Sequence, residues 1–243
     1  MTRARRSSRR ALTVTAAVII LGAAAAAVVT ARGGHGGGAP QGHGTAAPSA
    51  APASAAPALP QVSFAGVHWA SYYGVQLPSS PSAGPRRASG GLASGYSDTP
   101  LGALLAALNI AVRANAQWGP GIFGPTIRDQ VTGPDAAALL AECQSAYSQE
   151  AQAAHVTGDG PLGYAFVTEE AFQWVDWTPA DATVDLVSAG PGSGGTTVRA
   201  SVEVQVTWDG GDWKVIAPPG GDWGNSAALL TSLDGYTIFP GQG

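Results

Sequence analysis

Cysteine is almost absent from this chain of 243 residues, which contains Cys143 alone. A single thiol cannot form an intramolecular disulfide, and a zinc site built from four cysteines, or from two cysteines and two histidines, is excluded by count. The sequence also lacks the G-x-S-x-G, H-E-x-x-H and Walker-type motifs of hydrolases, zinc proteases and nucleotide-binding proteins. We therefore predict no catalytic residue, no cofactor and no metal site.

Charged residues are scarce, at 12% of the chain, and they are unevenly distributed. Residues 1–60 contain six arginines and no acid, whereas residues 61–243 contain six bases and sixteen acids and so have a formal charge of −10. Nucleic-acid surfaces need clustered Lys and Arg to contact phosphates, so the acidic part argues against a nucleic-acid partner. Its length of about 180 residues is enough for one domain with its own core.

The first 60 residues predict a membrane anchor and a tether. Residues 1–10 are a basic tail, and an uncharged run follows that begins at Ala11 and ends at Ala31. About 20 such residues span a bilayer as a helix, and the arginines predict a cytoplasmic N-terminus. A cleaved signal peptide is the alternative, although the length of the run favours a retained anchor. Residues 32–60, rich in Gly, Ala, Pro and Ser, predict a disordered linker, and both alternatives export the remainder.

The clearest pattern is a β-hairpin over residues 197–217. Even positions from 198 to 208 are apolar or small, and odd positions from 197 to 207 are polar, which predicts a strand with one face on a core. The turn sequence D-G-G-D follows at residues 209–212, and the apolar residues then occupy odd positions. With the two glycines as the loop, Val206 faces Val215 and both apolar rows share one face.

Residues 61–95 predict an extended aromatic arm and a loop, and residues 96–243 predict a domain in which helices precede strands. Thr99 and Pro100 have the residue types that start a helix, and Cys143 lies on the apolar row of a later helix, where a buried thiol is expected. The pair Glu169 and Glu170 falls between two expected strands and is predicted to be a solvated turn. The expected helices cover residues 99–117, 124–130, 133–155 and 222–232, and the expected strands cover 163–168, 172–177, 183–188, 197–208, 213–217 and 235–239.

Helices followed by an antiparallel sheet that ends in W-D-G-G-D-W-K-V resemble the nuclear-transport-factor-2-like (cystatin-like) fold, over roughly residues 96–217. The segments G-Y-S-D-T-P-L-G-A (95–103), V-T-G-P-D (131–135) and G-Y (235–236) extend the resemblance to exported actinobacterial proteins of integrative conjugative elements. Their layout of one membrane span, a loose tether and one such domain is similar to that of the inner-membrane scaffold subunits of conjugative channels. The resemblance implies an α+β fold, with helices packed on a curved antiparallel sheet in the shape of a cone, and it brings no catalytic residue with it.

The resemblance implies an extracytoplasmic scaffold that acts by protein–protein contact. Its expected partners are the membrane, through residues 11–31, and other envelope or transfer-complex proteins, and an oligomer is compatible with this role. Aromatic side chains are enriched at such interfaces, although ordinary packing is the common role of large aromatics. The candidate contact residues lie outside the clear core rows, and they are Trp69, Trp118, Phe123 and Trp223.

A small-molecule-binding or isomerase- or cyclase-like protein, exported to the envelope, is the alternative. Catalytic members of the resembling fold need an Asp or His base inside the cone, with a polar partner for the developing oxyanion. The sequence leaves open whether Asp176 and Asp185 face inward, whereas Glu203 is expected to point away from the core and His155 to end a helix outside it. A ligand-binding domain without catalysis is the third class considered.

Overall fold

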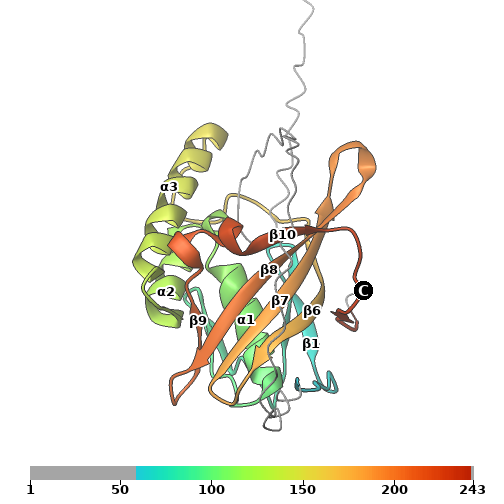
Figure 1. Ribbon diagram of the computed structural model, residues 1–243. Helices are drawn as coiled ribbons and strands as arrows, with labels where there is room; N and C mark the ends of the chain where they lie inside the picture. Colours follow the sequence, from blue (N-terminus) through green and yellow to red (C-terminus); the bar gives the residue numbers. More distant parts are fainter. Residues whose placement is uncertain (1–58, 242–243) are drawn as a thin grey trace, which may run out of the picture.

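The computed structural model describes residues 59–241, so the predicted basic tail, the predicted membrane span and nearly all of the predicted linker lie outside the described residues (Figure 1). Within residues 59–241 no helix is long and apolar enough to cross a bilayer. The α-helices of this part are α1 (Pro100–Arg113), α2 (Pro120–Gln130) and α3 (Ala136–Ala154). Its strands are β1 (His68–Tyr72), β2 (Val75–Ser79), β3 (Arg87–Ser89), β4 (Leu92–Ser94), β5 (Val131–Thr132), β6 (Thr168–Trp177), β7 (Asp181–Pro191), β8 (Thr197–Trp208), β9 (Trp213–Ile216), β10 (Ala227–Leu230) and β11 (Thr237–Ile238).

The predicted hairpin of residues 197–217 is confirmed as β8 and β9. Val206 lies opposite Val215, as the two-glycine loop requires, and the Asp209 N–H donates to the Asp212 carbonyl at 3.2 Å across that loop. Val202, Val204 and Val206 are fully buried because their side of the sheet packs against α1. The mixed α+β architecture and the mainly antiparallel sheet are therefore as predicted.

The main sheet has the strand order β11-β6-β7-β8-β9-β5, and β5 is parallel to β9. We call the side that faces α1 the inner face and the opposite side the outer face. β10 pairs with β8 beyond the point where β9 ends, and the chain then passes to the far edge of the sheet, where β11 pairs with β6 (Figure 1). The C-terminal segment thus connects the two edges of the sheet.

The prediction of a short helix over residues 222–232 is wrong. A single 3₁₀ turn, Trp223–Ser226, is capped by Asp222, whose side chain accepts the Gly224 N–H at 2.8 Å, and β10 follows. The hydrogen-bonding edge of β8 near Arg199 is open because β9 is short, and pairing with that edge overrides the weak helical preference of the sequence.

Helix α1 begins as predicted but ends earlier. Thr99 caps it by accepting the Gly102 N–H, and Pro100 occupies its first turn. The helix stops at Arg113 rather than near Gln117, because Asn115 starts a separate 3₁₀ turn by accepting the Gln117 N–H. Every residue from Gly102 to Arg113 is buried, so α1 has no solvent face, unlike the one-sided helix expected.

Small side chains explain this burial of α1. Alanine occupies positions 103, 106, 107 and 111, and all four are fully buried. Their size allows β2, β4 and α2 to approach α1 while β7, β8 and β9 cover it from the sheet. A helix that is apolar all round is a buried helix.

Helix α2 is longer than predicted, whereas α3 ends where predicted. Pro120 starts α2 after Gly119, whose φ is +83°, so the helix is a full element rather than the short turn expected over residues 124–130. Helix α3 ends next to His155, as predicted, and His155 caps it in the left-handed conformation. Cys143 is 5% exposed and donates to the Ala114 carbonyl, which confirms a buried thiol.

The stretch predicted as an extended arm folds into hairpins instead. β1 pairs with β2 through a turn at Tyr73 and Gly74, which both have positive φ, and β3 pairs with β4. The turn escaped prediction because a tyrosine rarely adopts the left-handed conformation.

Candidate functional site

The pair Glu169 and Glu170 lies within β6 and not in a solvated turn, so that prediction is wrong. A register shift between Glu169 and Ala171 marks a β-bulge, and the bulge gives the two consecutive acids different environments. Glu170 forms a two-pronged ion pair with Arg199, at 2.5 and 3.0 Å. Glu169 is 1% exposed, and its Oε2 accepts the Ser188 hydroxyl at 2.8 Å.

Glu169 borders a small cavity of about 20 Å³ that is partly open to solvent. A space of this size accommodates about one water molecule. Burial raises the pKa of Glu169 to about 7, and the hydrogen bond from Ser188 acts in the opposite direction. A carboxyl group that titrates near neutral pH is chemically suited to donate or accept a proton. The other lining residues are Val75, Val112, Asn115, Trp118, Ala165 and Val167.

The extended segment of residues 164–167 forms one wall of this cavity. Ala165 and Val167 are buried and line the cavity, whereas Tyr164 and Phe166 alternate with them and are 70% and 75% exposed. The Ala165 N–H donates to the Tyr73 carbonyl at 2.9 Å, which ties the segment to the β1–β2 turn. One short segment therefore has a cavity on one side and two large exposed aromatic rings on the other.

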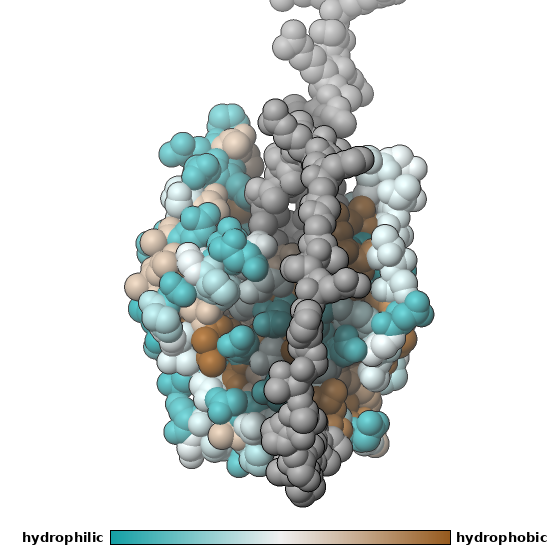
Figure 2. Space-filling view, in the orientation of Figure 1, coloured by the Kyte–Doolittle hydropathy of each residue, from teal (hydrophilic) through white to brown (hydrophobic). Residues whose placement is uncertain are grey.

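We call the exposed rings of Tyr73, Tyr164 and Phe166 the aromatic surface. The ring of Tyr73 lies 6.4 Å from that of Tyr164 and stacks on buried Trp118 at 5.7 Å, with an angle of 25° between the planes. The Trp118 indole N–H donates to the Val112 carbonyl, so the ring beneath Tyr73 is fixed. Figure 2 shows that apolar residues on the visible side of the domain lie in several separate places among hydrophilic ones.

A buried arginine lies beneath this surface. Arg113, at the end of α1, is 6% exposed, and its Nη1 donates to the carbonyl oxygen and to Oδ1 of Asn109, at 3.0 and 2.7 Å. Its guanidinium lies 4.3 Å from the centroid of the Tyr72 ring. Within residues 59–241 no carboxylate forms an ion pair with Arg113, and burial lowers its pKa. The cation is stabilised by neutral acceptors and an aromatic face, and it holds Tyr72 against Trp118.

Comparison with family profiles gives a match to "Domain of unknown function (DUF8175)" over residues 22–238. The chain belongs to the DUF8175 family. Comparison with curated proteins finds no match, and comparison with solved structures also finds none.

Three of the four predicted contact residues are buried in the interior of the DUF8175 domain. Trp118, Phe123 and Trp223 are 2%, 0% and 4% exposed, so their side chains pack against the rest of this chain. Trp69 is partly buried, with its ring 5.4 Å from that of Phe239. Trp118 lies under the aromatic surface, whereas Trp69 lines a separate pocket.

The acids that the enzyme alternative singled out do not line the Glu169 cavity. Asp176 is exposed, and Asp185 accepts the Tyr236 hydroxyl at 2.5 Å on the outer face, in register with exposed Glu203. This Asp–Tyr pair therefore lies outside the interior where a base would be needed. His155 ends α3 and is exposed.

No group of three or more His, Cys, Asp or Glu side chains in the described part of this DUF8175 chain is arranged to hold a metal ion. Sequence reasoning missed the residues that the structure brings to the site, Glu169 and the aromatic surface. The alternation of Tyr164 and Phe166 with Ala165 and Val167 is visible in the sequence, where it predicts a strand. The pattern of one exposed and one buried side was correct, although residues 164–167 pair with no strand.

Proposed function

We propose that the chain is a membrane-anchored extracytoplasmic interaction domain that acts by protein–protein contact in a conjugative transfer or related envelope complex. The observation that carries the proposal is the aromatic surface, in which Tyr73, Tyr164 and Phe166 place three exposed rings on an acidic domain. Aromatic side chains provide much of the binding energy at protein interfaces. The stacking of Tyr73 on fixed Trp118 means that this part of the surface needs little ordering when a partner binds.

The rest of the proposal rests on the sequence. Residues 11–31 are the proposed anchor, with the basic residues 1–10 in the cytoplasm, and residues 32–60 are the proposed linker. The proposed fold is the cone-shaped cystatin-like one. Its support is that α1, α2 and α3 precede the long strands β6–β9 and that α1 packs on the inner face of the sheet.

The test is capture of partners by the tagged full chain from cross-linked membranes of the native host. We expect transfer-channel proteins with the wild type, and at least about tenfold less of them with Tyr164→Ser/Phe166→Ser, since one or two interface rings contribute about 2 kcal/mol or more. The matched control is Val175→Ser/Leu229→Ser, which removes apolar side chains that are also exposed, at 51% and 76%. Capture of no channel protein, or equal loss in both variants, would contradict the proposal.

A second candidate function is small-molecule binding or isomerase- or cyclase-like proton transfer. Its support is the Glu169 carboxyl group, with its pKa near 7 beside a cavity. The cavity is too small for a substrate, so residues 164–167 would have to move outward for one to enter. Deuterium exchange at the carbon next to the carbonyl of a β,γ-unsaturated ketone, measured with wild type and with Glu169→Gln, tests this alternative. Equal exchange with both proteins counts against it.

A further inference from the structure

A separate pocket of about 480 Å³ opens where three parts of the chain converge. The arm before β1 forms one wall, β1 and β2 form the second, and the chain after β11 forms the third. This volume lies within the range of small-ligand sites in proteins. The pocket shares no residue with the aromatic surface or with the Glu169 cavity. Its lining residues are Phe64, Val67, His68, Trp69, Gln76, Pro240 and Gly241.

The aromatic walls of this pocket are held in place by packing. Phe239 is 5% exposed, and its ring lies 5.4 Å from that of Trp69 and 5.8 Å from that of Phe64. Phe239 in turn stacks on Phe172 of β6, at 5.2 Å with 24° between the planes. Trp69 and Phe64 are therefore braced from behind by the main sheet, so binding would require little ordering of these rings.

The polar side chains that line the pocket are those of Gln76 and His68. Gln76 lies in β2 on the same side of the hairpin as Trp69, because Ser71 pairs with Gln76 and Trp69 pairs with Pro78. A glutamine amide both donates and accepts hydrogen bonds, and His68 adds an imidazole. None of the seven lining residues is Asp, Glu, Lys or Arg. A phosphorylated or otherwise strongly charged ligand would find no ionic partner here.

We propose that this pocket binds a neutral glycan, with one sugar ring packed on Trp69 and a polar substituent hydrogen-bonded to Gln76. A sugar ring has an apolar face of C–H groups that suits an indole and a rim of hydroxyl or acetamido groups that suits an amide. A purely apolar ligand would leave the Gln76 and His68 groups unpaired. The acetamido group of an N-acetylated sugar can both donate to and accept from the Gln76 amide, so an N-acetylglucosamine oligomer is the probe of choice.

The test is isothermal titration of the full chain with N-acetylchitotetraose, in a detergent whose head group is not a sugar. We expect binding that weakens at least about tenfold in Trp69→Ala, since stacking on one aromatic ring contributes about 1–3 kcal/mol. The matched control is Trp208→Ala, which removes a partly buried tryptophan outside the pocket and should bind like the wild type. Cellotetraose, which lacks acetamido groups, should bind more weakly, and that difference should disappear in Gln76→Ala.

Absence of heat with N-acetylchitotetraose, cellotetraose and maltotetraose up to about 10 mM would overturn the glycan proposal, because that limit excludes even millimolar affinity. Equal binding by wild type and by Trp69→Ala would overturn the assigned site. If Trp69→Ala does not fold, as judged by circular dichroism, Gln76→Ala decides the question, because removal of an amide from a partly exposed strand leaves the ring packing intact.

Discussion

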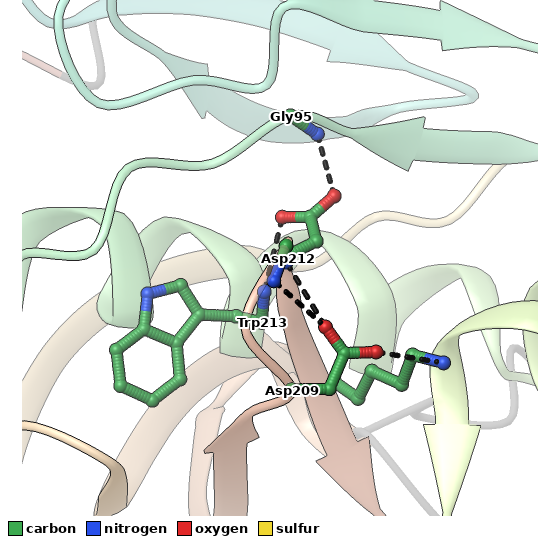
Figure 3. Close-up of polar contacts among 6 residues, drawn as sticks. Gly95, Asp209, Asp212 and Trp213 are labelled. Carbon is green, nitrogen blue, oxygen red and sulfur yellow. Dashed lines mark hydrogen bonds and ion pairs between the residues drawn. The ribbon is translucent and has the colours of Figure 1, made fainter.

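The carboxylate of Asp212 accepts the backbone N–H of Gly95 at 2.6 Å, although the two residues are 117 positions apart in the chain (Figure 3). Its second oxygen accepts the Tyr96 N–H at 2.9 Å. The tight turn between β8 and β9 is thereby tied to the loop that leads into α1. On the other side of the same turn, Asp209 accepts the N–H groups of Gly211 and Asp212 and pairs with Lys214. The two aspartates of the D-G-G-D sequence have different roles, one between elements and one within the turn.

Replacement of Asp212 by alanine should lower the free energy of unfolding by about 2–3 kcal/mol, because the backbone N–H groups of Gly95, Tyr96 and Trp213 lose a charged acceptor. Urea denaturation followed by tryptophan fluorescence measures this change. The control is Asp234→Ala, because Asp234 is exposed and its replacement should change stability by less than about 0.5 kcal/mol. Equal effects of the two substitutions would show that the tie to Gly95 contributes nothing.

Glu169 should make the stability of the domain fall as the pH rises. Its pKa is raised from 4.5 to about 7 in the folded state, so the folded chain binds the proton more tightly than the unfolded chain. The stabilisation is complete below the unfolded-state pKa and is lost as the pH rises to the folded-state pKa, a change of about 3 kcal/mol. In Glu169→Gln this change should be absent, so the variant should equal the wild type at pH 5 and exceed its stability at pH 8.

Thermal unfolding at several pH values between 5 and 8 is the measurement for Glu169. Glu203→Gln is the matched control, because Glu203 is exposed on the outer face and should leave the pH profile unchanged. Parallel profiles for Glu169→Gln and the wild type would mean that Glu169 is ionised in the folded protein across this range.

Gly74 should not tolerate alanine. A Cβ atom at this position would lie 2.1 Å from the carbonyl oxygen of Ala165, and the φ of +97° disfavours any other residue. We expect a loss of more than about 2 kcal/mol, together with cleavage by chymotrypsin at Tyr164 and Phe166, because the displaced segment loses its tie to Tyr73. Gly90→Ala separates the effect of the close approach from that of the positive φ. Gly90 also has a positive φ, of +60°, but a Cβ there meets no atom within 4 Å. If both variants lose the same stability, the close approach to Ala165 is not the cause.

The double variant Tyr164→Ser/Phe166→Ser should keep the stability of the wild type to within about 1 kcal/mol. Both side chains are largely exposed, and surface substitutions of this kind have small effects on folding. Differential scanning calorimetry checks this. A large drop in the unfolding temperature would assign the two rings a packing role and would weaken the case for the aromatic surface as a partner site.

The parts of the fold that the sequence predicted are those determined by local patterns. The β8–β9 hairpin follows from a period of two and a glycine turn, and the first residues of α1 follow from the capping role of Thr99 and the fixed φ of Pro100. These features need no information from distant residues.

The candidate site could not be predicted because distant contacts determine it. Glu169 is buried since a bulge in β6 turns it toward Ser188, and neither the bulge nor the pairing has a local sequence pattern. The turn at Tyr73 depends on a tyrosine in a left-handed conformation, which stacking on Trp118 favours. The long burial of α1 depends on alanines whose role appears only when β2 and β4 pack against them.

The complete enclosure of α1 sets an order for folding. The helix is finished at Arg113, but its cover on one side is β7, β8 and β9, which is complete only at Ile216. During synthesis, the apolar residues of α1 are therefore made about a hundred residues before the strands that cover them on this side. Contacts between residues so far apart in sequence form slowly, so the core around α1 closes only after β9 is available.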